Sequence, residues 1–205
     1  MKAFFMKLSL IWWCLWSSVR FAKQERFFYD VATQDKIKDN LDIIKLAKRV
    51  YSKFKYTQDD ISQLWDAIVP PPQNYLNYRG GIIEDDCDGF HSAVYHVLAN
   101  SKIIQDCYLM AVTAKECGHC VVVYRFDNKW YVLDYRKLYQ GFDTLKEAYE
   151  DYNKDYSKKY NAPSGVYYNG FVKYNYNKGV FYLVDISKIK QGEKLEKKEV
   201  VEEDE

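Results

Sequence analysis

Residues 86–99 have the sequence DCDGFHSAVYHVLA, and this stretch decides how the fold is interpreted. Its large apolar side chains recur at helical spacing and form one expected buried line, made of Phe90, Val94 and Leu98. Cys87 lies on that line, one residue after an aspartate that can cap a helix. The pattern predicts a helix from about Asp86 to Ala99 with a cysteine in its first turn.

A cysteine at the start of a helix is a candidate nucleophile. The thiolate is the reactive form, and unpaired amides and the partial positive charge of a helix N-terminus lower the pKa of a thiol. Three neighbouring carboxylates, Asp85, Asp86 and Asp88, would oppose thiolate formation if they faced the sulfur, although one or two are expected to cap the helix. A cysteine taken alone is more often a small buried hydrophobe, so partners elsewhere in the chain must support the prediction.

Two runs further along the chain predict an antiparallel hairpin. Residues 121–126 and 130–135 are rich in Val, Tyr and Trp, and three turn-forming residues separate them. A capping box that begins at Thr144 then opens a helix. Strands near 166–176 and 180–186 are expected to close the fold.

The hairpin bears on His119 and Asp134. If it turns through a two-residue loop, both residues lie on the same face of the sheet, with Asp134 opposite Val121 or Val123. The first register makes them diagonal neighbours with Cβ atoms about 7 to 8 Å apart, which the two side chains can bridge. Asp134 would then orient the imidazole of His119, which would accept the thiol proton of Cys87.

The segment before Cys87 is expected to hold two helices and a loop. A surface helix over residues 35–55 has a predicted buried stripe of Ile37, Leu41, Ile44, Ala47, Tyr51 and Phe54. Thr57 and Asp60 approximate a capping box for a second helix, which the prolines at 70–72 would end. A loop over 73–85 should lead into the site.

Short motifs in this order resemble a known family. Asp86-Cys87-Asp88-Gly89-Phe90 resembles the Asp-Cys-acid-x-Phe signature of bacterial transglutaminase-like cysteine proteins. Gly118-His119 before a β run and Trp130-Tyr131-Val132-Leu133-Asp134 resemble the histidine strand and the Trp-x-x-x-Asp strand of that family. The resemblance covers about residues 60 to 136. The chain departs from the pattern at Gly89, where a second acid often stands, and at His91, where a small residue is usual.

The resemblance implies an α+β, papain-like or transglutaminase-like core, with the cysteine helix packed on an antiparallel sheet. It implies Cys87 as nucleophile, His119 as base and acid and Asp134 as orienter, with no cofactor. We therefore expect a cysteine-dependent amide hydrolase or acyltransferase that forms an acyl-thioester with a peptide, protein or other amide. His91 lacks an obvious carboxylate partner and is expected only to line the pocket. The oxyanion hole is expected to combine the Cys87 amide with a side chain from Trp65, Gln73 or Asn74.

Three alternatives stay open. The chain could be a non-catalytic protein-binding module on the same fold. The string Cys117-Gly118-His119-Cys120 matches a thiol-disulfide oxidoreductase motif, but that motif must open a helix, whereas the valines that follow favour a strand. Zinc could be held by Cys107, Cys117, His119 and Cys120, although paired knuckles with regular spacing are missing and adjacent strand residues point to opposite faces.

Length and composition set the remaining expectations. The 205 residues suit one domain, and a net charge of +1 argues against recruitment of nucleic acid. Five scattered cysteines favour reduced thiols and a cytoplasmic location, with an exported or membrane-associated one as the alternative. The oligomeric state is left open.

Three segments are expected along the chain. Residues 1–30 contain an amphipathic helix that docks on the domain or makes peripheral membrane contact; a signal or anchor is the alternative, and the apolar run is too short to span a bilayer. Its apolar stripe comprises Phe4, Phe5, Leu8, Ile11, Trp12, Leu15, Trp16 and Val19. Residues 31–188 form the transglutaminase-like domain, and residues 189–205 a disordered charged tail.

Overall fold

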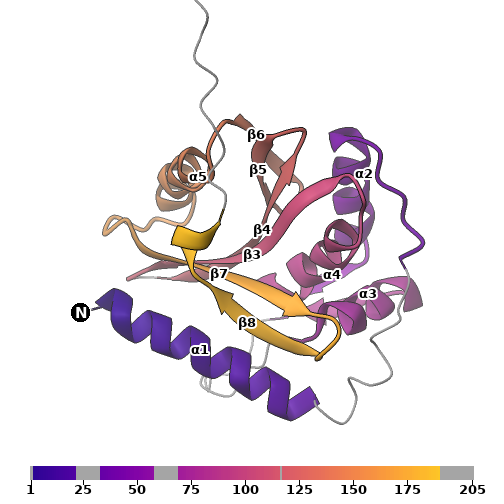
Figure 1. The fold of residues 1–205 in the computed structure, drawn as a ribbon, viewed down its shortest axis with the longest axis horizontal. Helices are drawn as coiled ribbons and strands as arrows, with labels where there is room; N and C mark the ends of the chain where they lie inside the picture. The colour runs from indigo at the N-terminus through magenta and orange to yellow at the C-terminus, as the bar shows by residue number, and fades with distance from the viewer. Residues whose placement is uncertain (1, 22–32, 58–68, 116, 190–205) are drawn as a thin grey trace, which may run out of the picture.

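The computed structural model describes residues 2–21, 33–57, 69–115 and 117–189 and has a mixed α+β fold (Figure 1). A six-stranded antiparallel sheet with the strand order β6-β5-β4-β3-β7-β8 forms its centre. Its strands are β3 Ile104–Ala114, β4 Gly118–Phe126, β5 Lys129–Asp134, β6 Lys137–Phe142, β7 Val166–Asn175 and β8 Val180–Val184. The short strands β1 Phe54–Tyr56 and β2 Ile83–Asp85 pair in parallel.

Five α-helices lie in the described residues, and they cover the sheet on both faces. They are α1 Lys2–Phe21, α2 Asn40–Tyr51, α3 Pro71–Gly80, α4 Cys87–Ala99 and α5 Leu145–Lys159. Figure 1 shows α5 on one side of the sheet and α2, α3 and α4 on the other. Alternate side chains of β4 pack in two different hydrophobic cores. Val122 and Tyr124 pack with α4, whereas Val121 and Val123 pack with α5. This period of two is the pattern of a strand buried on both faces.

The hairpin prediction is confirmed. Val122 pairs with Leu133 and Phe126 with Lys129, so β4 and β5 are joined by the two-residue turn Asp127-Asn128. Both turn residues have positive φ, at 49° and 58°, which suits the right-handed twist of a tight hairpin. Continuing the register by one pair places Asp134 opposite Val121, the first of the two predicted options.

Helix α4 also agrees with the prediction, because it runs from Cys87 to Ala99 with Asp86 as its N-cap. The capping box at the start of α5 is present as well: Thr144 accepts from the Glu147 amide, and Glu147 accepts from the Thr144 amide. The last two predicted strands are β7 and β8. The helix predicted after Thr57 and most of the tail at 189–205 lie outside the described residues.

The segment before α4 differs from the prediction at two points. The loop expected over 73–85 is instead helix α3 followed by strand β2, because Pro71 takes the first helical position, where a missing amide proton has no consequence. The helix expected over 35–55 is only α2, and its buried face holds Ile43, Leu46, Ala47 and Val50. Of the predicted stripe, Ile37 and Ala47 are buried, whereas Leu41 is 57% and Tyr51 37% exposed.

The N-terminal helix is present, but its predicted stripe faces outward. Helix α1 lies along β8 (Figure 1) and is buried there through Leu10, Cys14 and Ser17. Leu10 reaches the sheet at Gly170, where a Cβ would collide with its side chain. The exposed apolar residues are Phe4, Phe5, Leu8, Ile11, Trp12, Leu15 and Val19. Among the described residues, no helix combines the length and the hydropathy that a membrane span requires.

Candidate active site

Cys87 is the first residue of α4 and faces the start of β4. The carboxylate of Asp86 caps the helix by accepting from the Asp88 amide at 3.0 Å, which confirms the capping role expected for one of the three aspartates. The Cys87 Sγ accepts a hydrogen bond from the backbone amide of Cys120 at 3.3 Å. The sulfur therefore lies beside the residue that follows His119 in the chain.

The resting thiol of Cys87 is protonated at neutral pH. Burial raises its pKa well above the usual value, and the charges of Asp86, Cys120 and Asp88 raise it further. The hydrogen bond from the Cys120 amide lowers the pKa but does not offset these effects. The thiol at this site needs a base to remove its proton.

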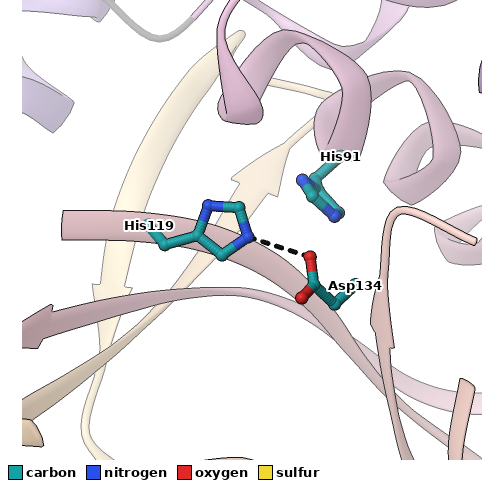
Figure 2. A group of neighbouring side chains, drawn as sticks. All are labelled: His91, His119 and Asp134. Carbon is teal, nitrogen blue, oxygen red and sulfur yellow. Dashed lines mark hydrogen bonds and ion pairs between the residues drawn. The ribbon is translucent and has the colours of Figure 1, made fainter. Parts of the chain in front are cut away.

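His119 and Asp134 supply a buried acid–base pair. Figure 2 shows His119 Nε2 hydrogen-bonded to Asp134 Oδ1, at 2.9 Å. The side chains are 6% and 0% exposed. Because a carboxylate only accepts, Nε2 carries the proton, and in a neutral ring Nδ1 is then free to accept one.

Asp134 is held in its ionised form. Its other oxygen accepts from Lys159 Nζ at 2.9 Å and from the Tyr152 hydroxyl at 3.4 Å. Burial alone would raise the pKa of Asp134, but the hydrogen bonds from His119 and Lys159 outweigh it. The pKa of this carboxyl therefore lies well below its ordinary value, and a negative charge stands behind the imidazole.

Aromatic rings enclose the His119 imidazole. Tyr156 stacks on it with centroids 6.1 Å apart, and Tyr160 and Tyr135 lie at 5.3 and 5.6 Å. Tyr135 belongs to the tight turn between β5 and β6 and has a φ of 50°, an uncommon conformation for a bulky residue. The surroundings strengthen the electrostatic contacts of the imidazole by excluding water.

His91 is not the simple pocket wall that the sequence predicts. It is fully buried on α4, and its Nε2 accepts from the backbone amide of Tyr135 at 3.0 Å. Nδ1 therefore carries the proton and donates to the Cys87 carbonyl at 2.6 Å. Burial, followed by the charge of His119, lowers the pKa of His91 to about 3, so the ring is neutral.

The structure brings the three predicted site residues together from α4, β4 and β5, although the contact between thiol and base is indirect. Both Cys87 and His119 are described, and no hydrogen bond joins the Sγ to the imidazole; the sulfur contacts the backbone of Cys120 instead. Catalytic hydrogen bonds are often long in a free enzyme and tighten when substrate binds.

Two of the three side chains expected in an oxyanion hole donate their amide hydrogen bonds to other residues. The Asn74 amide donates to Ser92 Oγ at 2.6 Å, and the Gln73 amide donates to Asn77 at 2.8 Å. Trp65 lies outside the described residues. The oxyanion-hole role expected for the Cys87 backbone amide stays a prediction, as does the role expected for Trp65.

The redox and zinc alternatives do not fit this geometry. Gly118, His119 and Cys120 begin strand β4, whereas a reactive dithiol motif must open a helix. Cys107 pairs with Tyr124 and Cys120 with Ala111, so the two cysteines are separated by four residues of strand, or about 13 Å. These four predicted zinc ligands cannot share one ion.

Two other groups of side chains have the composition of a metal site. His91, His119 and Asp134 place ligand atoms within 4.8 Å of one another, as do Asp85, Asp86 and Asp88. In the first group, His91 has no free lone pair and His119 Nε2 carries a proton, because hydrogen bonds already occupy these atoms. The second group surrounds the α4 N-terminus, where the Asp85 carboxyl fills the space that a side chain at position 89 would need. This contact explains why position 89 is a glycine.

A shallow pocket of about 500 Å³ lies at the Asp134 end of the site. Lysine and arginine dominate its wall, and the complete lining is Lys48, Tyr51, Asp134, Tyr135, Arg136, Lys137 and Lys159. The Arg136 guanidinium lies 4.2 Å from the centre of the Tyr51 ring. Local sequence patterns reveal neither Tyr135 and Lys159 nor the hydrogen bonds of His91, because these contacts join distant elements.

No protein-family model matches the chain, and neither a curated protein nor a solved structure does so. The function therefore has to be argued from the chemistry of the site itself.

Proposed function

We propose that this chain is a transglutaminase-like cysteine enzyme, an amide hydrolase or acyltransferase that works through an acyl-thioester on Cys87. The observation that carries the proposal is the buried hydrogen bond from His119 to the ionised Asp134, placed beside a cysteine that opens a helix. A neutral thiol, an imidazole with one free lone pair and a carboxylate behind it are the three parts of a nucleophile–base–orienter set.

The chemistry follows from these roles. As Cys87 Sγ attacks the carbonyl carbon of an amide, its proton passes to His119 Nδ1, and Asp134 stabilises the imidazolium that forms. The imidazolium then gives this proton to the leaving nitrogen, the C–N bond breaks, and a thioester remains on Cys87. Water or an amine next attacks the thioester with His119 as base, which restores the thiol and releases an acid or a new amide.

The transglutaminase-like or papain-like fold belongs to the same proposal. Its support is the order of the parts: a helix that starts with the cysteine, followed by antiparallel strands that carry the histidine and then the aspartate. The substrate would be a peptide, protein or other amide. The proposal also includes peripheral membrane contact through the exposed face of α1. The chemistry at Cys87 does not depend on that contact.

One observation favours a second function, a non-catalytic binding module on the same fold. The pKa of the Cys87 thiol is raised rather than lowered, partly by the charges of Asp86 and Asp88. A site selected only for binding would have no need of an activated thiol. Reaction of the native protein with an acyl donor separates the two functions.

The test uses p-nitrophenyl acetate as an activated acyl donor. We expect release of p-nitrophenolate and an acetyl group on the Cys87 peptide, identified by site-resolved mass spectrometry, with loss of both in Cys87→Ala. His119→Ala should slow acylation by about 100-fold or more, because it removes the general base. His96→Ala is the matched control, since His96 is also buried on α4 but contacts Tyr176 instead of the site. Equal acylation of wild type and His119→Ala would refute the enzymatic proposal.

A further inference from the structure

His91 is the residue of the site whose contacts the proposed mechanism does not use. Its ring is fully buried and makes one hydrogen bond at each nitrogen, to the Cys87 carbonyl at 2.6 Å and from the Tyr135 amide at 3.0 Å. Both partners are backbone groups, so the contacts fix the main chain rather than another mobile side chain. The hydrogen bond from Tyr135 connects positions 44 residues apart in the sequence.

The two anchored backbone groups flank the proposed reacting residues. Cys87 itself provides the carbonyl, and Tyr135 follows Asp134 directly. Tyr135 has a φ of 50°, a conformation that a bulky residue keeps only when its surroundings hold it there. The hydrogen bond to His91 is one such restraint on the end of β5.

The His91 ring also packs on the proposed base. The rings of His91 and His119 meet edge to face, with centroids 5.6 Å apart and planes at 89°. Figure 2 shows His91 above the hydrogen-bonded pair of His119 and Asp134, on the side of α4. One side chain thus touches the Cys87 backbone, the His119 ring and the turn after Asp134.

We propose that His91 is a positioning residue that holds the Cys87 turn, the His119 ring and the end of the Asp134 strand in one arrangement, and so sets the reactivity of the thiol. This inference rests on the proposed function. Reaction rates respond steeply to such restraints, because a misplacement of about 1 Å can slow a reaction by about 100-fold.

The first experiment compares Cys87 alkylation by iodoacetamide in wild type, His91→Phe and His91→Gln, measured by site-resolved mass spectrometry. Phenylalanine keeps a flat ring but has no hydrogen-bonding group, and we expect it to slow Cys87 labelling by about 10- to 100-fold. Glutamine keeps one donor and one acceptor and should stay within about 5-fold of wild type. Val97→Ala, a fully buried change on the same helix, is the matched control for lost stability and should leave the rate unchanged.

A second measurement does not depend on reactivity. Nitrogen-15 NMR of the imidazoles should show His91 as the neutral tautomer with the proton on Nδ1 across the neutral pH range, and hydrogen exchange of the Tyr135 amide should accelerate in His91→Phe but not in Val97→Ala. A proton on Nε2, or a Tyr135 amide that exchanges equally in all variants, would overturn the proposal. So would stoichiometric Zn²⁺ binding that His91→Phe abolishes, because it would require a free lone pair on His91.

The two proposals can fail separately. If wild-type Cys87 labels no faster than Cys87 in His119→Ala, the enzymatic function fails, whatever His91 does. If Cys87 labelling is slower in His119→Ala than in wild type but equally fast in His91→Phe, the enzymatic function stands and the positioning role of His91 is refuted.

Discussion

Neutralising Asp88 should make Cys87 more reactive. Asp88 lies next to Cys87 in the first turn of α4, and its charge is one of the causes that raise the pKa of the thiol. Asp88→Asn removes this charge and keeps the size of the side chain. Asp86 is the less suitable target because its carboxylate caps the helix, so its replacement would also disturb the turn.

The magnitude follows from Coulomb's law. A unit charge about 6 Å from the sulfur, at an effective dielectric constant of about 20 to 40, contributes about 1.4 to 2.8 kcal/mol, or about one to two pKa units. Removing a negative charge stabilises the thiolate, so the pKa of Cys87 should fall by that amount. At a pH below the pKa, each decrease of one pKa unit increases the thiolate fraction tenfold. The thiolate also becomes less nucleophilic as its basicity falls, so the net gain in alkylation rate is about 3-fold per pKa unit.

The assay is the rate of Cys87 alkylation by iodoacetamide from about pH 6 to pH 10, followed by site-resolved mass spectrometry. We expect a rate at neutral pH about 3- to 10-fold above wild type and a lower midpoint of the pH profile. Glu84→Gln is the matched control: this carboxylate is exposed on β2, pairs with Lys55 and is not among the groups that shift the thiol. A rate and midpoint in Asp88→Asn equal to those of wild type would refute the electrostatic explanation of the raised thiol pKa.

Three further predictions test other parts of the structure. Gly170→Ala should loosen the packing of α1 by about 1 to 3 kcal/mol, because a Cβ at position 170 collides with Leu10. The rate of maleimide labelling of the buried Cys14 should then rise by about 5- to 100-fold. Gly80→Ala is the control and should not change this rate, because a Cβ at position 80 meets open space. The pKa of Asp134 is depressed in the folded protein, so its stabilising contribution is complete above about pH 4 and is lost as the pH falls. The free energy of unfolding, measured with denaturant, should therefore change less between neutral and acidic pH in Asp134→Ala than in wild type. Thr144→Ala should lower the free energy of unfolding by about 1 kcal/mol, measured by urea titration, because it removes the α5 cap; an unchanged value would contradict that role.

The parts of the fold that the sequence predicts well are those that local rules determine. The tight turn at Asp127-Asn128 sets the register of the hairpin, so it places Asp134 beside His119 without any knowledge of the rest of the chain. The N-cap at Asp86 and the capping box at Thr144 likewise depend on neighbouring residues only.

The parts that were predicted wrongly depend on tertiary contacts. On α1, many apolar residues surround the helix, and packing on β7 and β8, with Leu10 against Gly170, selects the face for burial. The role of His91 depends on a backbone amide 44 residues away, which no local pattern of residue types reveals. The prolines at 70–72 favour two opposite structures, since proline can end one helix or begin the next.

The central claim is that His119 activates Cys87, and the pH dependence of Cys87 alkylation in wild type and His119→Ala tests it most directly. The hydrogen bond at this sulfur comes from the backbone amide of Cys120, and His119 is the residue directly before that amide in the chain. If His119 is the base, wild-type Cys87 should react with iodoacetamide at neutral pH at least about 10-fold faster than in His119→Ala, and the two rates should converge at high pH, where hydroxide ionises the thiol. Identical pH profiles in the two proteins would contradict the claim.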